Sequence, residues 1–262
     1  MLEGKLFKNR RVFYKKCQLE SVTFQINFNP ILSIETDFPA EFQKEIINEF
    51  PFYSEYIETR QIQIDDNIKF PLKQIDSKKH VFHSKDKQTI LSLSSSYLSI
   101  SVNRYEKFEK FLDPILYVSK IFYRIYNPIY FTRIGLRYID LFRRSKLGLE
   151  NSSWNELIKD EYLGFYKNIK NDELKRMRNE YLIEINENSV VRILTGFVYT
   201  KAEQLNEKPE LCFLLDSDFF YKHEFGLEDL NDKLSFLHNN SIGLVAEVVT
   251  EKLNDKMEPE DC

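Results

Sequence analysis

The feature that most constrains the fold is an order of predicted elements that occurs twice along the chain. Residues 17–126 read as a strand, a short helix, several strands and a long amphipathic helix, and residues 129–256 repeat that order. Strands with one apolar face need a covering layer, which a helix with an apolar stripe supplies. The sequence therefore predicts an α+β protein of two similar halves, residues 17–128 and 129–256, with antiparallel sheet covered by two long helices.

Hydrophobic periodicity sets the predicted elements, since alternation marks strands and a spacing of three or four marks helices. In the first half it predicts strands at 19–28, 56–64, 80–84, 88–94 and 97–103, and helices at 39–50 and 105–126. In the second half it predicts strands at 129–142, 180–186, 190–200 and 211–218, and helices at 151–159 and 227–256. Gly243 lies inside the last helix, where glycine costs about 1 kcal/mol relative to alanine, so we expect a kink or close packing there.

Charge is unevenly distributed along a chain whose formal net charge is only -4. The N-terminal segment, residues 1–16, holds six basic residues against one acidic residue, and residues 257–262 form an acidic tail. We expect the tail from Glu258 to Cys262 to be disordered. Residues 104–146 hold ten basic and four acidic residues interleaved with tyrosines, a pattern typical of single-strand nucleic-acid binding but equally of core and core-edge aromatics.

Composition excludes several classes of function. The chain has only 7 glycines in 262 residues, and neither of the two common Gly-rich phosphate loops is present. The 3 cysteines form no CxxC pair and offer no zinc template. No apolar stretch reaches the roughly 18 residues of a membrane helix, and no signal sequence opens the chain. We therefore expect a cytoplasmic protein without a membrane segment, a metal or a cofactor.

Residues 133–140, RIGLRYID, form the most distinctive motif of the chain. The motif resembles the central strand of a sporadically distributed family of uncharacterised bacterial and archaeal proteins of about 250 residues. The segments 91–111, 214–218 (LLDSD) and 237–238 (LH) are also similar to that family, whereas Asp140 stands where Asn is more common. The resemblance implies no activity. The patchy distribution of that family implies a setting in phage or mobile-element defence. The duplicated element order also resembles TATA-binding-protein-like folds, which by itself implies no DNA function.

Two pairs of charged residues are candidates for a binding site. In the predicted strand 129–142, alternation puts Arg133 and Arg137 on one face with Gly135 between them, a notch that suits a phosphate or carboxylate. Asp216 and Asp218 share a face of another strand and suit a divalent metal or acid–base work. The alternative interpretation is a structural Arg/Asp network across these four residues, which predicts that Asp216→Ala destabilises the fold.

The remaining candidates are a tyrosine and the histidines. Tyr138 belongs to the predicted core face of the 129–142 strand, and His238 lies beside the apolar stripe of the last helix as a hydrogen-bonded core-edge residue. His80 and His83 fit a solvated hairpin better than a metal site, because residues three apart on a strand face opposite sides. No arrangement for nucleophilic catalysis is present in the sequence.

These observations favour a non-catalytic binding or adaptor subunit of a prokaryotic multi-protein system, with a protein partner. A nucleic-acid-binding protein or metal-dependent nuclease is the first alternative. It would use the Arg133/Arg137 notch on phosphate and Asp216/Asp218 on metal. A sensor of a small anionic ligand in the same notch is the second alternative. The sequence leaves the oligomeric state open.

Overall fold

The computed structural model describes residues 6–7, 11–62, 73–168, 176–200 and 209–261. Internal contacts divide the chain into two compact units. Unit 1 comprises Met1–Val22, Gly135–Tyr221 and Lys233–Cys262, and unit 2 comprises Thr23–Ile134 and Lys222–Asp232. The division passes through two long strands, β2 (Leu19–Phe28) and β7 (Phe131–Phe142), so both units contain part of each.

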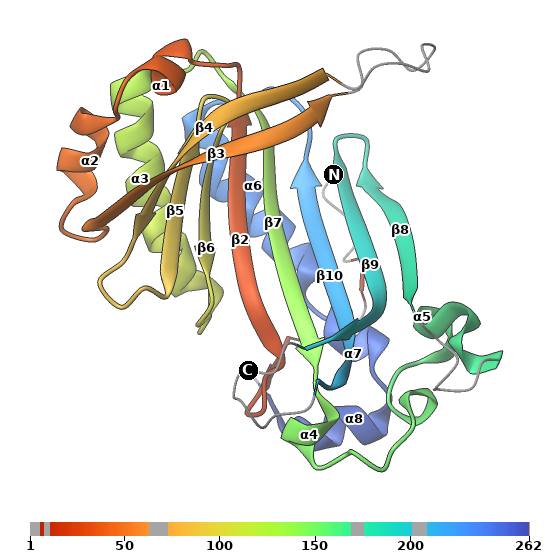
Figure 1. Ribbon diagram of the computed structural model, residues 1–262. Helices are drawn as coiled ribbons and strands as arrows, with labels where there is room; N and C mark the ends of the chain where they lie inside the picture. The colour runs from red at the N-terminus through yellow and green to blue at the C-terminus, as the bar shows by residue number, and fades with distance from the viewer. Residues whose placement is uncertain (1–5, 8–10, 63–72, 169–175, 201–208, 262) are drawn as a thin grey trace. The chain divides into compact units, whose positions relative to one another are not determined.

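Unit 2 is built on strands in the order β3-β4-β5-β6-β2-β7 (Figure 1). The first four are β3 (Phe52–Ile62), β4 (Lys73–His83), β5 (Thr89–Ser94) and β6 (Tyr97–Val102), and consecutive members pair antiparallel. Its helices are α1 (Leu32–Thr36), α2 (Ala40–Ile46) and α3 (Phe108–Tyr126), with the 3₁₀ helix η3 (Leu227–Asp229). The strands at 19–28, 88–94 and 97–103 and the helix at 105–126 were predicted to within three residues.

The core of unit 2 follows from strand alternation. Phe24, Ile26 and Phe28 of β2 are buried, and the ring of Phe28 lies 4.6 Å from that of Phe122 in α3. Phe82 of β4 packs edge-on against Phe42 of α2. The predicted apolar stripe of α3 therefore covers one face of the strands, and α2 extends that cover.

Unit 1 contains strands in the order β2-β7-β10-β9-β8, where β8 is Met177–Asn186, β9 is Ser189–Tyr199 and β10 is Leu211–Tyr221. The last three form an antiparallel meander. Between β7 and β8 lie α4 (Arg144–Leu147), the 3₁₀ helix η1 (Trp154–Glu156), α5 (Asp160–Leu163) and the 3₁₀ helix η2 (Gly164–Asn168). Their aromatic centre is Trp154, whose ring lies 5.6 Å from Phe197 and 6.1 Å from Phe213.

The single long helix predicted at 227–256 is wrong. The chain forms η3, α6 (Leu230–Ser241), α7 (Leu244–Val248) and α8 (Glu251–Lys256) instead. Gly243 breaks the first junction with a φ of 95°, a left-handed value that glycine adopts without steric cost, so the predicted kink is confirmed. At the second junction, Val249 is extended and the Thr250 N–H donates to the carbonyl of Leu157.

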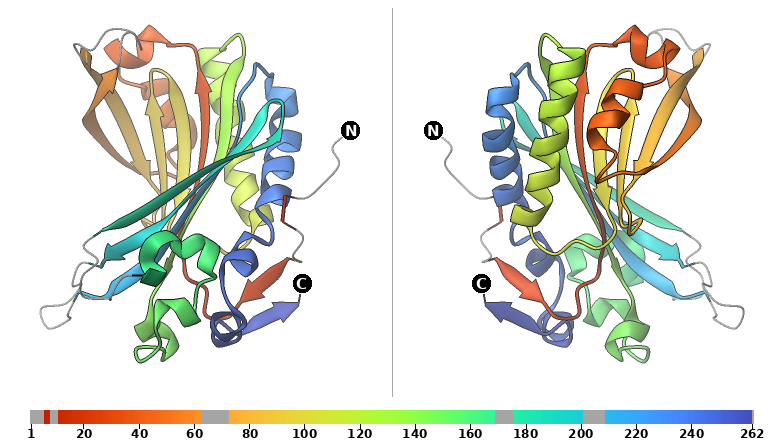
Figure 2. Two further views of the ribbon diagram at one scale, coloured as in Figure 1. Left: turned by 90° about the vertical axis from the view of Figure 1, so that its right-hand side faces the viewer. Right: turned by 90° about the vertical axis from the view of Figure 1, so that its left-hand side faces the viewer.

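The predicted disorder of the acidic tail is also wrong. Pro259–Asp261 forms β11, which pairs antiparallel with β1 (Val12–Tyr14) near the start of the chain (Figure 2). Ion pairs join Lys15 to Glu260 at 2.9 Å and Lys16 to Glu258 at 2.7 Å. The tail is ordered because the basic N-terminal segment supplies both a strand partner and opposite charge. Cys262 lies outside the described residues.

The predicted α+β class is confirmed, with antiparallel sheet packed against helices. The two halves are similar but not identical in element order, because β3–β6 are followed by one long helix and β8–β10 by several short ones. The sequence-based division into halves 17–128 and 129–256 and a tail 257–262 follows the order of elements along the chain, and it stays a prediction. Within the described ranges, no helix is both long and apolar enough to cross a membrane.

Candidate functional site

Arg137 of β7 and Asp216 of β10 form a two-pronged ion pair on neighbouring strands. The arginine Nε donates to Oδ1 at 2.7 Å and Nη2 donates to Oδ2 at 2.6 Å. Asp216 is buried, whereas 43% of the Arg137 side chain is exposed. Hydrogen bonding to Asp216 raises the pKa of Arg137 above its usual range, and the charges of Asp216 and Asp218 act in the same direction. The carboxylate therefore holds the guanidinium in a fixed orientation.

Strand alternation places this pair on one face of the sheet. Ile134 and Leu136 of β7 are fully buried on the opposite face, as predicted. In β10 the same alternation separates Asp216 and Asp218 from the buried Leu215 and Phe219. The structure thus brings together three members of the predicted Arg/Asp network, Arg137, Asp216 and Asp218. Arg133 lies half-buried in the part of β7 that belongs to unit 2, and its place in the network stays a prediction.

Tyr138 and His238 meet on the other face of β7. The Tyr138 hydroxyl lies 3.1 Å from Nδ1 of His238 in α6, and its ring packs edge-on against Phe219. Burial raises the pKa of Tyr138 above its usual value. This geometry gives both residues a structural place at the edge of the core.

Asp140, the last residue of the RIGLRYID motif, is the most perturbed carboxyl group near these residues. It is buried in unit 1, and burial, followed by the charge of Glu20, raises its pKa to about 7. Its charge in turn contributes to the raised pKa values of Tyr14 and Cys17. Sequence reasoning did not select Asp140 as a site residue. The available signal was the unusual acid at a position where the resembled family more often has Asn.

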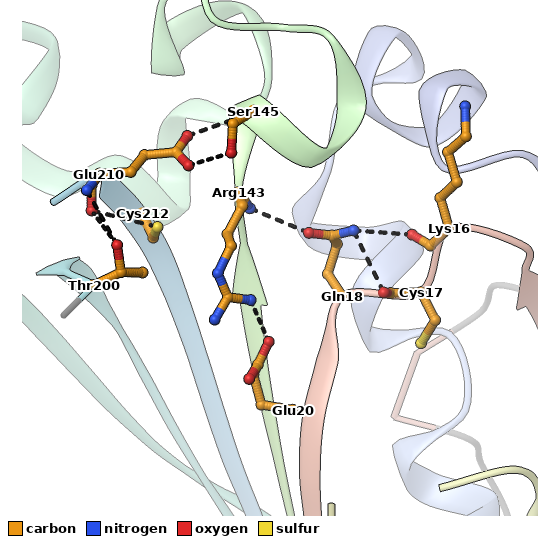
Figure 3. Close-up of polar contacts among 9 residues, drawn as sticks. All are labelled: Lys16, Cys17, Gln18, Glu20, Arg143, Ser145, Thr200, Glu210 and Cys212. Atoms are coloured by element: carbon orange, nitrogen blue, oxygen red, sulfur yellow. Dashed lines mark hydrogen bonds and ion pairs between the residues drawn. The ribbon is translucent and has the colours of Figure 1, made fainter. Parts of the chain in front are cut away.

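Polar contacts in unit 1 fasten the start of β2 to the end of β7 (Figure 3). Arg143 donates to the Glu20 carboxylate, and its backbone N–H donates to Oε1 of Gln18 at 3.1 Å. Nearby, Glu210 accepts from the backbone N–H of Ser145. Cys212 is buried, and its pKa is raised to about 11, chiefly by burial. A thiol with that pKa stays protonated at neutral pH, which makes Cys212 a poor nucleophile. Because the contacts of this cluster join β2 to β7, we interpret the cluster as a structural brace.

The two histidines of β4 do not form the solvated hairpin that the sequence predicted. His80 is fully buried, with Nδ1 2.9 Å from the Tyr53 hydroxyl and Nε2 2.9 Å from the carbonyl oxygen of Ile34. It attaches α1 to the sheet. His83 lies three residues further along β4 and is half-buried. Across the described part of the chain, no group of three His, Cys, Asp or Glu side chains is placed to hold a metal ion.

The tyrosines of the basic segment 104–146 make many contacts within unit 2. Tyr123 packs against Phe131, and Tyr126 packs against Phe42 and Phe122. Tyr117 is partly exposed, and its hydroxyl donates to the carbonyl of Glu45. These contacts give Tyr117, Tyr123 and Tyr126 a role in packing, and nucleic-acid binding through residues 104–146 stays a prediction.

Among the described residues, exposed large apolar side chains are concentrated on residues 32–57 of unit 2. Six large side chains in this run are between 47% and 74% exposed: Leu32, Phe38, Ile47, Phe52, Tyr56 and Ile57. Phe38 lies beneath the ammonium of Lys78, and Ile57 is the cross-strand neighbour of that same lysine. Along β3, alternation points Phe52 and Tyr56 to one face of the strand and Ile57 to the other, so the six residues flank both faces of this strand. We call these six residues the 32–57 surface. Sequence reasoning missed it, because outward-facing and buried apolar residues of short elements look alike in the sequence.

Known families and curated proteins add no assignment to these residues. No family model matches the chain, and no curated protein sequence matches it.

Proposed function

We propose that this protein is a non-catalytic binding subunit that recruits a protein partner through the 32–57 surface. The observation that carries the proposal is the exposure of six large apolar side chains within one short run of unit 2. Exposed apolar patches on otherwise well-packed proteins commonly mark interaction sites, and aromatic side chains are enriched in interface cores.

The charged candidates give weaker support to catalysis. Arg137 is already bonded twice to Asp216, so a phosphate would compete with a carboxylate, and a metal would compete with the guanidinium. Breaking such a pair costs free energy, because it leaves one buried charge without its partner. The geometry is that of a structural ion pair.

The setting we propose is a multi-protein prokaryotic system, with phage or mobile-element defence as its role. Support for this setting comes from the RIGLRYID resemblance and not from the geometry of unit 1 or unit 2. A binding subunit fits such a setting because assembly then supplies the chemistry that the chain itself does not.

The test is affinity capture of the tagged protein from a host that carries the native gene neighbourhood. We expect one protein to co-purify in stoichiometric amount. The double variant L32S/F38S should reduce the recovered amount of that protein about tenfold or more. Ile129→Ser is the matched control, because Ile129 is 90% exposed in unit 2 but lies outside the 32–57 surface. All three positions are exposed, so the substitutions should leave stability nearly unchanged.

Two outcomes would contradict the proposal. Recovery of the protein without any partner, even at low salt, would contradict the adaptor function. A complex that nuclease destroys and that weakens steeply with salt would favour the nucleic-acid alternative, because phosphate contacts release counterions.

A further inference from the structure

Strand β3 is an open edge of the sheet in unit 2. In the strand order of the described residues it is terminal, with β4 as its neighbour (Figure 1). Its exposed side chains include Phe52, Tyr56 and Ile57. Proteins usually blunt such edges with charge, proline or a bulge, because an open edge pairs with other strands.

The strand at the other end of the order is guarded. The exposed positions of β8 carry Arg178, Glu180 and Glu184, and Leu182 is the one large apolar side chain among them. β3 also exposes Glu55, but three of its exposed side chains are large and apolar, against one in β8. That contrast indicates that the β3 edge is kept open for pairing.

The outward backbone groups of β3 can be identified from Lys78 on β4. The Lys78 N–H donates to Glu35, and its carbonyl accepts from Ser94 on β5, so both of these groups point away from β3. Lys78 stands opposite Ile57, which makes this a pair without mutual hydrogen bonds. The N–H and C=O of Ile57 therefore point outward, as do those of Tyr53, Glu55 and Thr59 by alternation.

We propose that β3 pairs antiparallel with β3 of a second copy of this chain about a two-fold axis. A two-fold contact joins one patch to itself, so β3 must be complementary to its own reverse. The outward backbone groups belong to odd-numbered residues, so odd-numbered residues of one copy must face odd-numbered residues of the other. Even-numbered residues then face even-numbered residues, as pairs without mutual hydrogen bonds, and the axis can lie on a residue of either kind.

Overlap and charge then select among these registers. An axis on Ser54 would pair only residues 52–56 of β3 and an axis on Thr59 only residues 56–62, whereas an axis near the middle of the strand pairs most of it. Centring the axis on Glu55 or on Glu58 sets two like carboxylates directly opposite each other, which is destabilising. Centring it on Tyr56 sets Tyr56 against its copy and Glu55 against Ile57 of the second copy. Centring it on Ile57 sets Ile57 against its copy and Tyr56 against Glu58 of the second copy. Both of these registers are free of opposed like charges between residues 52 and 59, which is the self-complementarity that a dimer requires.

This inference does not rest on the proposed partner. Dimerisation through β3 would cover Phe52, Tyr56 and Ile57, and it would leave Leu32, Phe38 and Ile47 of the 32–57 surface to the partner. Dimerisation is tested on purified protein alone, whereas partner capture is tested at Leu32 and Phe38. Failure of one experiment leaves the other unaffected.

The first test is light scattering of the purified full chain at micromolar concentration. We expect a mass near twice the 31.4 kDa of one chain. Tyr56→Glu should raise the dissociation constant about tenfold or more, because the introduced carboxylate faces its copy in one register and Glu58 in the other. Leu182→Glu on β8 is the matched control. Both new carboxylates gain a basic cross-strand neighbour, Lys79 for position 56 and Arg192 for position 182. The control should remain dimeric.

The second test exchanges charge. If the axis lies at Tyr56, Tyr56→Lys is also monomeric, and mixing it with Tyr56→Glu restores a dimer that contains one copy of each. If the axis lies at Ile57, Tyr56→Lys dimerises by itself through Glu58 of the second copy. Either result supports β3 pairing. A monomeric natural chain, or a Tyr56→Glu variant with an unchanged thermal melt and an unchanged dimer, overturns it.

Discussion

At the scale of single residues, the raised pKa of Asp140 predicts a dependence of stability on pH. The folded protein holds its pKa at about 7, first through burial and then through the charge of Glu20. An aspartate in an unfolded chain titrates near pH 3.9. Between these values the folded state binds the additional proton. Stability therefore falls as pH rises from about 4 to about 7, and above that it no longer changes through this group. Three pKa units correspond to about 4 kcal/mol.

Asp140→Asn should remove that loss, because an amide has the shape of the carboxyl group but does not ionise. We expect urea unfolding at pH 8 to show a gain of about 2 to 4 kcal/mol, shrinking to little below pH 4. Besides burial, the charge of Glu20 contributes to this effect, and the charge of Asp140 in turn raises the pKa values of Tyr14, Cys17 and Tyr138. Asp113→Asn, at an exposed position of α3, is the control for the same change of side chain on the surface. An equal pH slope in Asp140→Asn and the natural chain would show that Asp140 is ionised in the fold.

At the scale of elements, the Arg137–Asp216 pair ties β7 to β10. Asp216→Ala should destabilise the protein by about 1 to 2 kcal/mol, a value kept low because half of the guanidinium is screened by water. Arg137→Ala should cost more than the lost ion pair alone, because it leaves Asp216 buried without its cation. In a double-mutant cycle measured by chemical denaturation, the double variant should lose less stability than the sum of the losses of the two single variants. Additive effects, or an unchanged melt for Asp216→Ala, would show that the pair contributes nothing to stability.

Long periodic elements were predictable from the sequence, and short ones were not. The β7 alternation of Ile134 and Leu136 and the stripe of α3 extend over enough residues to identify the element and its buried face. The five residues of α1 have no such signal. They are held by tertiary contacts such as the one from His80 to Ile34. Pairing of Arg137 with Asp216 was predictable as one of two alternatives, because opposite charges on adjacent strands either pair or bind a ligand.

At the scale of the whole molecule, both ends of the described chain belong to unit 1 and neutralise each other there. β1 and β11 pair along their three residues, and the Lys15 and Lys16 backbone N–H groups donate to the carbonyls of Glu258 and Met257. Hydrogen bonding to Lys16 lowers the pKa of Glu258, and hydrogen bonding to Glu260 raises the pKa of Lys15. The acidic strand therefore covers part of the basic segment 1–16 and reduces its attraction for other anions.

The double variant E258K/E260K should separate these strands, because it places lysines opposite Lys15 and Lys16. We expect faster amide hydrogen exchange at Val12–Tyr14 and stronger, salt-sensitive retention on a polyanion such as heparin, since the basic segment loses its acidic cover. Adding K15E and K16E reverses both partners of each pair and should restore slow exchange. Because surface ion pairs alone contribute little, slow exchange in E258K/E260K would mean that backbone pairing suffices to hold β11 against β1, which is itself tied to α8 by the Tyr14 to Asn254 hydrogen bond. Fast exchange that the reversed pairs correct would show that charge selects the tail as the partner of β1.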